Sequence, residues 1–379
     1  MKILEVSLGV GAASGGPVRS ITGLARALSF VEDCEVVYFV HNPNGIERFD
    51  LGNVKVIRGH WNDCGNDFSS DFENALVAER PDLVHFHGIW HLTLHSDQAV
   101  CRKHGIPYLI APRGSLDAWS MQQKWLKKKI AMMVFQKRDL DRAAALHVTA
   151  EMEATHCRNV GYEGKFILSP NGINLPKDLP TWKQHEDGGR RMLFLSRMHP
   201  KKGVLELVDA WARLRQSNNR GIDQWRCELV YTLFDDAERE YEARVKSRVL
   251  GLGLADSFLF TGSLSDVDKW SAYRRANCFV LPTHTENFGI VIAEALYAGL
   301  PVITTTNAPW QGLVKNGCGW WIDLSQGNLQ KALLDAISLS DAERTAMGEA
   351  GRKFVVDHYS WPMIAKNFAA DCRKLIGGA

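Results

Sequence analysis

Two glutamates, Glu286 and Glu294, stand eight residues apart in the stretch HTENFGIVIAEALYAG (284–299). The apolar residues around Glu294 predict a helix that starts after Glu286 and contains Glu294. One interpretation is structural, with one acid that caps the helix and a second that is buried beside partners. The other is that two carboxylates bind the two ends of one elongated ligand. Eight helical residues span about 12 Å, roughly the distance from a hexose to a ribose across a diphosphate.

Basic residues occupy a second candidate position. The stretch LFLSRMHPKKG (193–203) has Arg197 at the end of a predicted strand and Lys202 beside Gly203, where a helix is expected to start. Cations at a helix N-terminus oppose the helix dipole at a cost of about 0.3–1 kcal/mol each, so an anion is expected to compensate. Each charge-assisted hydrogen bond to that anion contributes about 1.5–3 kcal/mol. The alternative is a solvated basic turn.

A glycine-rich loop follows the first predicted strand in SLGVGAASGGPVRS (7–20). Ser14 stands where a dinucleotide-binding fingerprint has its third glycine, which argues against a nicotinamide cofactor. Gly15 and Gly16 nevertheless offer backbone amides at a helix N-terminus, which suits a phosphate. A tight turn that needs glycine for its dihedral angles explains them equally well.

The elements that position these residues follow from the alternation of short apolar runs with amphipathic runs along most of the chain. This pattern is typical of parallel sheets covered by helices. Ligands of such sheets bind beyond the carboxyl ends of the strands, where all three candidate loops lie. Strands are predicted at 2–7, 34–40, 54–59, 82–88, 107–114, 145–150, 165–172, 191–197, 227–233, 257–262, 277–282 and 301–305.

A length of 379 residues exceeds what one hydrophobic core usually supports, so two domains are expected. The segment 169–190 is rich in Pro, Gly and charge and has no apolar periodicity, which indicates an interdomain linker. We therefore predict an N-terminal domain at 1–172 and a C-terminal domain at 173–359. A final helix in 360–379 is expected to pack back onto the first domain.

Composition excludes several classes of protein. The chain is 45% hydrophobic and 23% charged, as in ordinary globular enzymes, and its net charge of +2 predicts no nucleic-acid partner. Eight scattered cysteines without a C-x-x-C pair suggest neither a disulfide framework nor a zinc site. Glu5 interrupts the short apolar N-terminus, and no run reaches 18 apolar residues, so we expect a cytoplasmic protein that contacts a membrane peripherally at most.

Four motifs occur in a characteristic order: SGGP (14–17), DLVHFHG (82–88), SRMHPKKG (196–203) and ENFGIVIAE (286–294). Together they resemble family 4 of the retaining glycosyltransferases, and the resemblance covers nearly the whole chain. It implies the GT-B fold, in which two Rossmann-like, doubly wound α/β domains face each other across a cleft. The segments APRGSLDAWS (111–120) and APWQGLVKNGCGWWI (308–322) resemble members that build bacterial exopolysaccharide and lipopolysaccharide.

The resemblance implies a site for a nucleoside diphosphate sugar, mostly in the second domain. Glu294 would bind the ribose, Glu286 the hydroxyls of the sugar, and the basic groups the diphosphate. The base would lie near the backbone of Ser263 and Leu264. The donor-binding residues implied are Gly15, Gly16, Arg197, Lys202, Ser263, Leu264, Glu286, Asn287, Phe288, Gly289, Ile290 and Glu294.

In the first domain, the resemblance puts His87 in the cleft near the anomeric centre and the acceptor, whereas His85 is expected in the core. Arg113 could contact an acceptor phosphate, or form a salt bridge to a neighbouring helix. Trp90 could stack on a sugar, although single tryptophans more often serve packing. The residues expected to carry catalysis are Arg197, Lys202, Glu286 and His87.

The expected activity is retaining, metal-independent transfer of a hexose, with UDP-glucose as the best single candidate donor and no cofactor. The acceptor would be a growing glycan or a lipid-linked saccharide in surface polysaccharide synthesis. One alternative is a nucleotide-sugar epimerase of related fold, which needs acid and base residues from both domains. The other is a catalytically silent subunit that binds a nucleotide sugar within a polysaccharide assembly complex.

Two D-x-D pairs mimic a metal-binding motif of another transferase fold, but their positions suggest structural roles. Asp266 is expected to cap a helix, and Asp139 and Asp141 to lie on the polar face of one, so no metal is predicted. The segment 123–142 is basic and amphipathic. It could contact the anionic inner face of the plasma membrane, or be a solvated helix that covers the sheet.

Overall fold

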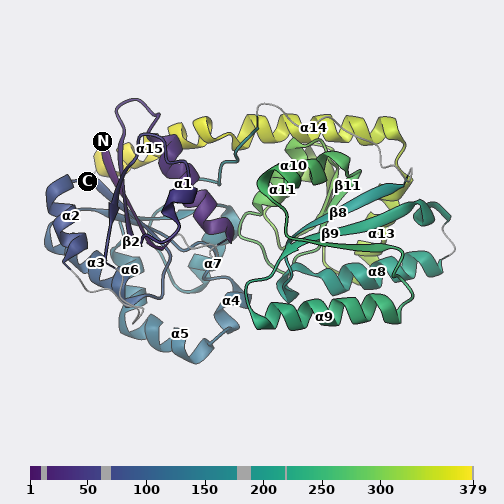
Figure 1. Ribbon diagram of the computed structural model, residues 1–379. Helices are drawn as coiled ribbons and strands as arrows, with labels where there is room; N and C mark the ends of the chain where they lie inside the picture. The colour runs from purple at the N-terminus through teal and green to yellow at the C-terminus, as the bar shows by residue number, and fades with distance from the viewer. Residues whose placement is uncertain (10–14, 61–69, 177–188, 218–219, 378–379) are drawn as a thin grey trace. The chain divides into compact units, whose positions relative to one another are not determined.

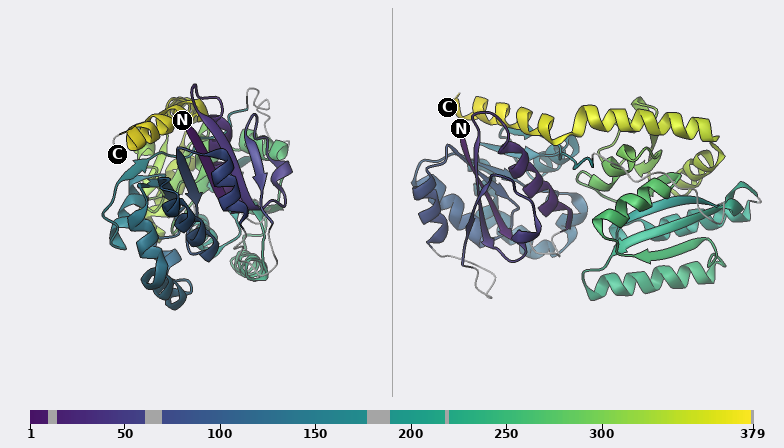
Figure 2. Two further views of the ribbon diagram at one scale, coloured as in Figure 1. Left: turned by 90° about the vertical axis from the view of Figure 1, so that its left-hand side faces the viewer. Right: turned by 45° about the horizontal axis from the view of Figure 1, so that its top comes forward.

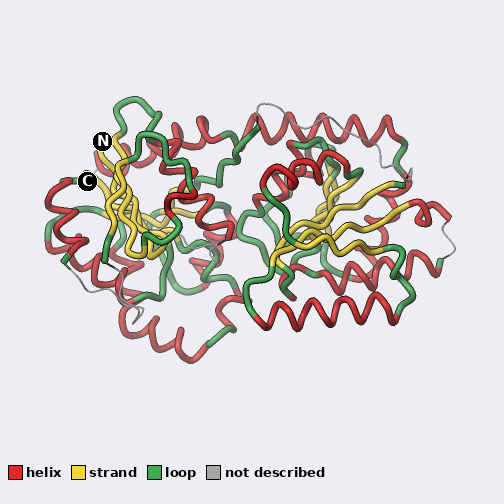
Figure 3. The backbone as a smooth tube through the Cα atoms, viewed as in Figure 1, coloured by secondary structure: helices red, strands yellow, loops and turns green. Residues whose placement is uncertain are grey.

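The computed structural model describes residues 1–9, 15–60, 70–176, 189–217 and 220–377. The chain divides into two compact units, coloured mostly purple to blue and mostly green to yellow in Figure 1. The first unit comprises Met1–Asn174 together with Tyr359–Ala379, and the second comprises Leu175–His358. Each unit is built of strands and helices that alternate along the chain, as Figure 3 shows.

The first unit has a seven-stranded parallel sheet with the strand order β3-β2-β1-β4-β5-β6-β7. The order reverses between β1 and β4, which is the arrangement of a doubly wound fold. Its strands are β1 (Lys2–Gly9), β2 (Glu35–Asn42), β3 (Lys55–Arg58), β4 (Leu83–His87), β5 (Tyr108–Ala111), β6 (Ala145–Val148) and β7 (Phe166–Leu168).

Helices cover both faces of this sheet. One face packs on α1 (Gly15–Leu28) and on α15 (Trp361–Gly377), which brings Phe368 and Ala369 from the end of the chain into the core. The other face packs on α2 (Asp71–Glu79), α3 (Leu92–Lys103), α6 (Lys137–Arg142) and α7 (Glu151–Asn159), and Met121 of the short α4 (Ala118–Gln122) packs against the same core. The unit also contains α5 (Trp125–Ala131) and the 3₁₀ turn η2 (Ile46–Arg48), whose Ile46 belongs to the core on the first face.

The predicted amphipathic segment 123–142 is helical without interruption from Trp125 to Arg142, as α5, a π-helical turn η3 (Met132–Gln136) and α6 in direct succession. The helix begins after Lys124, whose φ of 50° separates it from α4. A left-handed residue of this kind cannot continue a right-handed helix.

The second unit has a six-stranded parallel sheet with the order β10-β9-β8-β11-β12-β13. The order again reverses next to the first strand, between β8 and β11, so this sheet is also doubly wound. Its strands are β8 (Arg190–Arg197), β9 (Trp225–Thr232), β10 (Phe258–Gly262), β11 (Cys278–Leu281), β12 (Val302–Thr305) and β13 (Gly319–Ile322).

Helices lie on both sides of the second sheet as well, and Figure 2 shows them from two further directions. One side carries α8 (Val204–Gln216), α9 (Asp236–Gly251) and α13 (Gln326–Ser338), as Figure 1 shows. The other carries α10 (Asp266–Arg275), α11 (Ile290–Tyr297) and α14 (Asp341–Tyr359). Shorter turns are η4 (Pro200–Lys202), η5 (Arg220–Gln224) and α12 (Gly312–Lys315).

All twelve strands predicted from the sequence are present, with ends that shift by a few residues. The sequence analysis missed β13, a four-residue edge strand whose side chains are only partly buried. The predicted fold class, two doubly wound α/β units, is confirmed. Among the described residues, no helix combines the length and apolar character that crossing a bilayer requires.

Trp361, at the start of α15, lies between two glycines of the first unit. A Cβ atom on Gly23 of α1 would overlap one end of the indole, and a Cβ on Gly172 would overlap the other end. The ring therefore has no room to move away from either backbone. This close approach joins the last helix to α1 and to the segment after β7.

We expect Gly23→Ala to destabilise the protein, although alanine usually stabilises a helix interior by about 0.5–1 kcal/mol. Overlap with Trp361 should instead lower the free energy of unfolding by about 1–3 kcal/mol. Denaturant unfolding of purified protein measures the change. Gly251→Ala in α9 is the matched control, because its Cβ meets nothing within 4 Å. A gain in stability for both variants would contradict this account of Trp361.

Candidate functional site

Two strand-end loops of the second unit are held together at the carboxyl edge of its sheet. The η4 turn follows β8, and residues 282–289 follow the neighbouring strand β11. The carbonyl of Lys201 accepts the amide of His284 at 2.8 Å and the hydroxyl of Thr283 at 3.0 Å. Gly203 has a φ of 70°, and a Cβ there would overlap the carbonyl of Pro282. Glycine is therefore required for the two loops to approach this closely.

The contact between the loops brings Lys202 and Glu286 together as an ion pair, with 2.5 Å between Nζ and Oε2. The other carboxylate oxygen of Glu286 accepts the amide of Asn287 at 3.0 Å. Burial alone would raise the pKa of Glu286, but the charge and hydrogen bond of Lys202 and the charge of Lys201 outweigh it and lower the pKa. Glu286 is therefore an ionised hydrogen-bond acceptor at neutral pH.

Helix α11 begins directly after this pair. Its N-cap is Gly289, with a φ of 82°, and no side chain caps the helix. The interpretation of Glu286 as a helix cap is thus wrong, because its carboxylate binds the amide of Asn287, which precedes the helix. In the described part of the chain, the amides of Ile290 and Val291 have no acceptor. A helix start of this kind favours an anion.

Glu294 lies in α11 and is almost fully buried, with two partners on α10. Lys269 Nζ lies 2.7 Å from Oε1, and the hydroxyl of Tyr273 donates to Oε2 at 3.0 Å. The partners that a buried carboxylate needs are therefore present. The structural interpretation of Glu294 holds to this extent, while the ribose-binding role stays a prediction.

Arg197, the last residue of β8, pairs with Glu238 in the first turn of α9. Its Nε donates to Glu238 Oε1 at 2.9 Å, and Nη2 makes a shorter contact with the same oxygen. The guanidinium also lies over the ring of Phe234, 5.0 Å from its centroid. Arg197 is thus held by neighbours that the sequence analysis did not name.

The other predicted donor-binding residues belong to other elements. Ser263 and Leu264 follow β10, the edge strand that β9 separates from β8. Gly15 and Gly16 are the first residues of α1, in the first unit, and residues 10–14 of their loop lie outside the described residues. The structure brings together Lys202, Glu286 and the start of α11 in one place.

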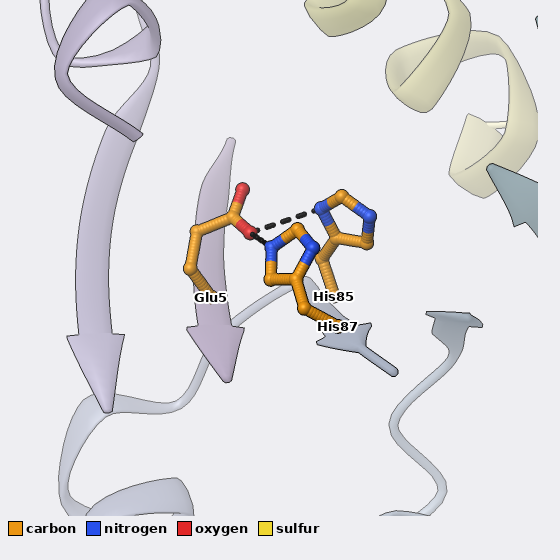
Figure 4. A group of neighbouring side chains, drawn as sticks. All are labelled: Glu5, His85 and His87. Carbon is orange, nitrogen blue, oxygen red and sulfur yellow. Dashed lines mark hydrogen bonds and ion pairs between the residues drawn. The ribbon is translucent and has the colours of Figure 1, made fainter. Parts of the chain in front are cut away.

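A buried polar cluster lies in the first sheet, on the face covered by α15. Glu5 of β1 is in register with His85 of β4, and both His85 and His87 point toward its carboxylate (Figure 4). His87 Nε2 lies 2.6 Å and His85 Nδ1 2.9 Å from Glu5 Oε2. The predicted divergence of the two histidines is therefore wrong. Residues two apart on a strand lie on the same face, and β4 continues through His87.

Carbonyl and imidazole partners determine the proton positions in this cluster. His147 Nε2 lies 2.9 Å from the carbonyl oxygen of Ser169, which only accepts, so this nitrogen is the donor. His147 Nδ1 then accepts from His85 Nε2 at 3.1 Å. Burial lowers the pKa of both rings well below the usual value, which keeps them neutral. His85 Nδ1 is then left without a proton, and among the described residues it forms no hydrogen bond, although it lies 2.9 Å from Glu5 Oε2.

The three residues Glu5, His85 and His87 have the ligand types of a transition-metal site, and their ligand atoms lie within 4.8 Å of one another. However, Arg113 Nη2 lies 3.0 Å from His87 Nδ1 and donates to it. His87 Nε2 is therefore protonated and donates to Glu5, so it offers no lone pair to a metal. The neighbouring guanidinium would also repel a cation, and these contacts favour a hydrogen-bonded network.

Arg113 and Trp90 both have positive φ angles, 54° and 76°, and internal partners. Arg113 binds His87 and, through Nη1, the side chain of Asn171 at 3.0 Å. The alternative of a salt bridge to a neighbouring helix is not found among the described residues. The amide of Trp90 donates to Gln136 at 2.7 Å, and its ring packs against the core. Both ring nitrogens of His87 are occupied inside the first unit. An acceptor-binding role for these residues stays a prediction.

The two D-x-D pairs have different environments. Ser265, not Asp266, is the N-cap of α10, and its hydroxyl accepts the amide of Asp268 at 3.2 Å. Asp139 is buried, in contrast to its predicted polar position, and accepts from His95 Nδ1 at 2.7 Å. Burial raises the pKa of Asp139. Asp141 is partly exposed and binds Lys137 one turn away.

Sequence reasoning missed three side chains that contact the predicted donor groups: Glu238, Lys269 and Tyr273. Glu238 and Lys269 both lie in the first turns of helices that follow strands of this sheet. An acid or base at such a position is a signal that could have drawn attention to them. Their partners depend on the strand order, which one sequence does not reveal.

Two protein-family models match consecutive parts of the chain. The model described as "Glycosyl transferase 4-like domain" matches residues 15–172, and "Glycosyl transferases group 1" matches residues 180–354. Together the two matches cover most of the chain.

Similar curated proteins and solved structures are also known. The chain is 30% identical over 131 residues to the lipopolysaccharide core biosynthesis mannosyltransferase LpsB of Rhizobium meliloti (strain 1021). This match covers 35% of each of the two chains. It is 23% identical over 312 residues to the GDP-mannose:cellobiosyl-diphosphopolyprenol alpha-mannosyltransferase of Xanthomonas oryzae pv. oryzae (strain PXO99A), covering 78% of this chain and 75% of the relative.

Sucrose-phosphate synthase from Thermosynechococcus elongatus superposes with a TM-score of 0.81 over all of both chains, at 21% identity. Anabaena HepE in complex with UDP-glucose gives a TM-score of 0.74 at 17% identity, over 99% of this chain and 100% of the other. At these identities the likeness concerns the fold. From the two family matches and the two doubly wound sheets, the chain belongs to glycosyltransferase family 4, with the GT-B fold.

Proposed function

We propose that the protein is a retaining glycosyltransferase that moves a hexose from a nucleoside diphosphate sugar to a glycan or lipid-linked acceptor in surface polysaccharide synthesis, without a metal ion. The observation that carries the proposal is the junction of Lys202, Glu286 and the start of α11 at one edge of a doubly wound sheet. It combines a cation, an ionised acceptor and backbone amides. These are the groups that a sugar joined to a diphosphate requires.

The donor would lie along α11. Its diphosphate would accept from the amides of Ile290 and Val291 and from Lys202, and its hexose hydroxyls would donate to Glu286. Glu294, two turns into the helix, would accept hydrogen bonds from the ribose hydroxyls while it stays paired with Lys269.

Catalysis would follow from where charge develops. Cleavage of the bond between the anomeric carbon and the diphosphate leaves negative charge on the leaving group. Cations held there in advance stabilise the transition state more than the ground state. Lys202 is the main candidate for this role, with Arg197 beside it, and retention of configuration is what membership of the family suggests.

Two donors are the leading candidates. UDP-glucose is the donor expected from the sequence, and HepE, a protein of similar fold, has been solved with it. GDP-mannose is the donor named for the Xanthomonas relative, and the match covers 75% of that protein. Both present the same diphosphate and a hexose, so the described groups serve either.

A panel of UDP-glucose, GDP-mannose and ADP-glucose tests the proposal. One donor at about 100-fold excess over its Kd should stabilise the protein by about 2.7 kcal/mol, seen as a rise in Tm. The same donor should be hydrolysed slowly without an acceptor. Binding without hydrolysis, with or without extracted lipid acceptors, would favour the silent subunit, and no shift with any donor would refute the proposal.

Substitution Glu294→Gln should weaken binding of the diphosphate of the preferred nucleoside by about 10- to 100-fold, because a hydrogen bond to a charged group contributes about 1.5–3 kcal/mol. Isothermal titration calorimetry measures the Kd. Glu228→Gln is the matched control. Glu228 is a buried carboxylate of the same unit that binds Arg275 at 2.6 Å. Equal loss of affinity in both variants would indicate a stability effect rather than ribose binding.

The basic segment that includes α5 and η3 would contact the inner face of the plasma membrane. Five of the fourteen large apolar side chains exposed in the described structure lie within it, each more than half exposed: Trp125, Leu126, Ile130, Met133 and Val134. Exposed lysines stand among them at Lys124, Lys127 and Lys129. Apolar side chains beside cations suit a surface of anionic lipid. A contact there would bring the enzyme close to a lipid-linked acceptor.

The variant Met133→Ser/Val134→Ser should bind vesicles that contain phosphatidylglycerol with an affinity lower by about tenfold or more. In the unchanged protein both apolar side chains would move from water into the lipid surface, and serine gains little from that transfer. Vesicle co-sedimentation measures this, with phosphatidylcholine vesicles as the neutral arm. The control is Leu250→Ser/Val267→Ser, which removes two exposed apolar side chains from the second unit. Undiminished binding of the first variant would contradict the proposed contact.

A further inference from the structure

The partner of Arg197 is a carboxylate that is almost completely buried. Glu238 has a relative exposure of 1%, although it lies in the first turn of α9 near a loop. One oxygen, Oε1, accepts from Nε of Arg197 at 2.9 Å and also from Nη2. The other oxygen, Oε2, accepts the amide of Phe234 at 2.7 Å. Both oxygens of this buried acid are therefore engaged, one by a side chain and one by the loop.

The strand order explains how the acid comes to lie beside Arg197. Strands β8 and β9 are neighbours, and Arg197 is in register with Thr232, the last residue of β9. Residues 233–235, which connect β9 to α9, therefore lie next to the end of β8. Asp235 caps α9 by accepting the amide of Glu238 at 2.9 Å, which fixes the first turn of the helix. Glu238 is thus held in position before any ligand binds.

The guanidinium is constrained on one edge and on one face. Glu238 takes the edge formed by Nε and Nη2, and the ring of Phe234 lies 5.0 Å from the guanidinium carbon. In the described part of the chain, Nη1 of Arg197 has no hydrogen-bond partner. A planar guanidinium held in this way keeps its remaining donors in a fixed direction, unlike a lysine ammonium.

A carboxylate is an unexpected neighbour for a cation that is to attract a diphosphate, because the carboxylate and the diphosphate are both negatively charged and repel each other. An arginine without such a partner would have to lose its rotational freedom when the donor binds. Glu238 and Phe234 remove that freedom when the protein folds, and so shift the cost of ordering Arg197 away from the binding step. In the proposed arrangement the positive guanidinium would stand between the carboxylate and the diphosphate, which would moderate their repulsion.

We propose that Glu238 is a positioning residue of the donor site, which acts through Arg197 by holding its guanidinium toward the diphosphate. This inference rests on the proposed function, since it takes Arg197 as a ligand of the donor phosphates. Glu238 itself touches no substrate. Phe234 supports the same orientation from the face of the guanidinium.

A double-mutant cycle tests whether Glu238 acts through Arg197. The variants are Glu238→Gln, Arg197→Ala and the double variant, and the readout is the Kd for UDP and for GDP by isothermal titration calorimetry. Glu238→Gln should weaken binding of the preferred nucleotide by about tenfold in the wild-type background. In the Arg197→Ala background the same change should have less than about a twofold effect, because the group that it positions is absent.

Two further variants separate this role from a loss of stability. Glu242→Gln, one turn further along α9, removes a carboxylate that binds Tyr231 and Lys246, and it should leave the Kd unchanged. If Glu238→Gln fails to fold, Phe234→Leu replaces it in the cycle with the same expectation. An effect of Glu238→Gln that persists in the Arg197→Ala background would overturn the inference.

The inference and the proposed function fail in different ways. If Arg197→Ala leaves the Kd unchanged while Lys202→Ala and Glu294→Gln raise it, Glu238 has no role in binding, but the proposed donor site stands. If all three substitutions leave the Kd unchanged, the proposed function fails and the inference fails with it.

Discussion

A carboxylate that leaves water needs a cation or several hydrogen-bond donors, and this requirement governs the carboxyl edge of the second sheet. Three acids that lie there each pair with a cation from a neighbouring loop, helix or strand end. The pairs are Glu286 with Lys202, Glu294 with Lys269 and Glu238 with Arg197. Formal charges therefore cancel within these pairs before any ligand enters. A negatively charged ligand would bind by exchanging or sharing partners, so its affinity would reflect the difference between two sets of contacts.

The first sheet meets the same requirement without a full set of counter-charges. Below α15, His87 donates to Glu5, His85 donates to His147, and Arg113 donates to His87 from the loop after β5. Neutral histidines are suited to this position because each ring can donate at one nitrogen and accept at the other. The result is a polar layer inside an otherwise apolar core, with the orientation of every ring determined by its neighbours.

Much of the fold could be predicted from the sequence, because alternating apolar and amphipathic runs are a local signal. The edge strand β13 was not predicted, because Gly319–Ile322 is short and only partly buried and so lacks a clear apolar run. Positions in loops were also accessible: Lys202 and Glu286 were named from their strand ends, and they do meet. The partners of Arg197 and Glu294 could not be named, because Glu238 and Lys269 approach them only through strand order and helix packing. The two histidines of β4 show the opposite error, in which an expectation from the resemblance overrode the alternation of a strand.

The return of α15 to the first unit has a consequence for the order in which the protein is made. Residues 1–174 leave the ribosome first, but the part of their sheet that α15 covers stays open until Trp361 and Phe368 emerge, after the whole second unit. The second unit, Leu175–His358, is a continuous segment and has its own core partners as soon as it leaves the tunnel. The unit encoded first is therefore completed last. During that interval the part of the core that α15 covers is exposed to chaperones and proteases, so the packing of α15 also ends a period in which the first unit is vulnerable.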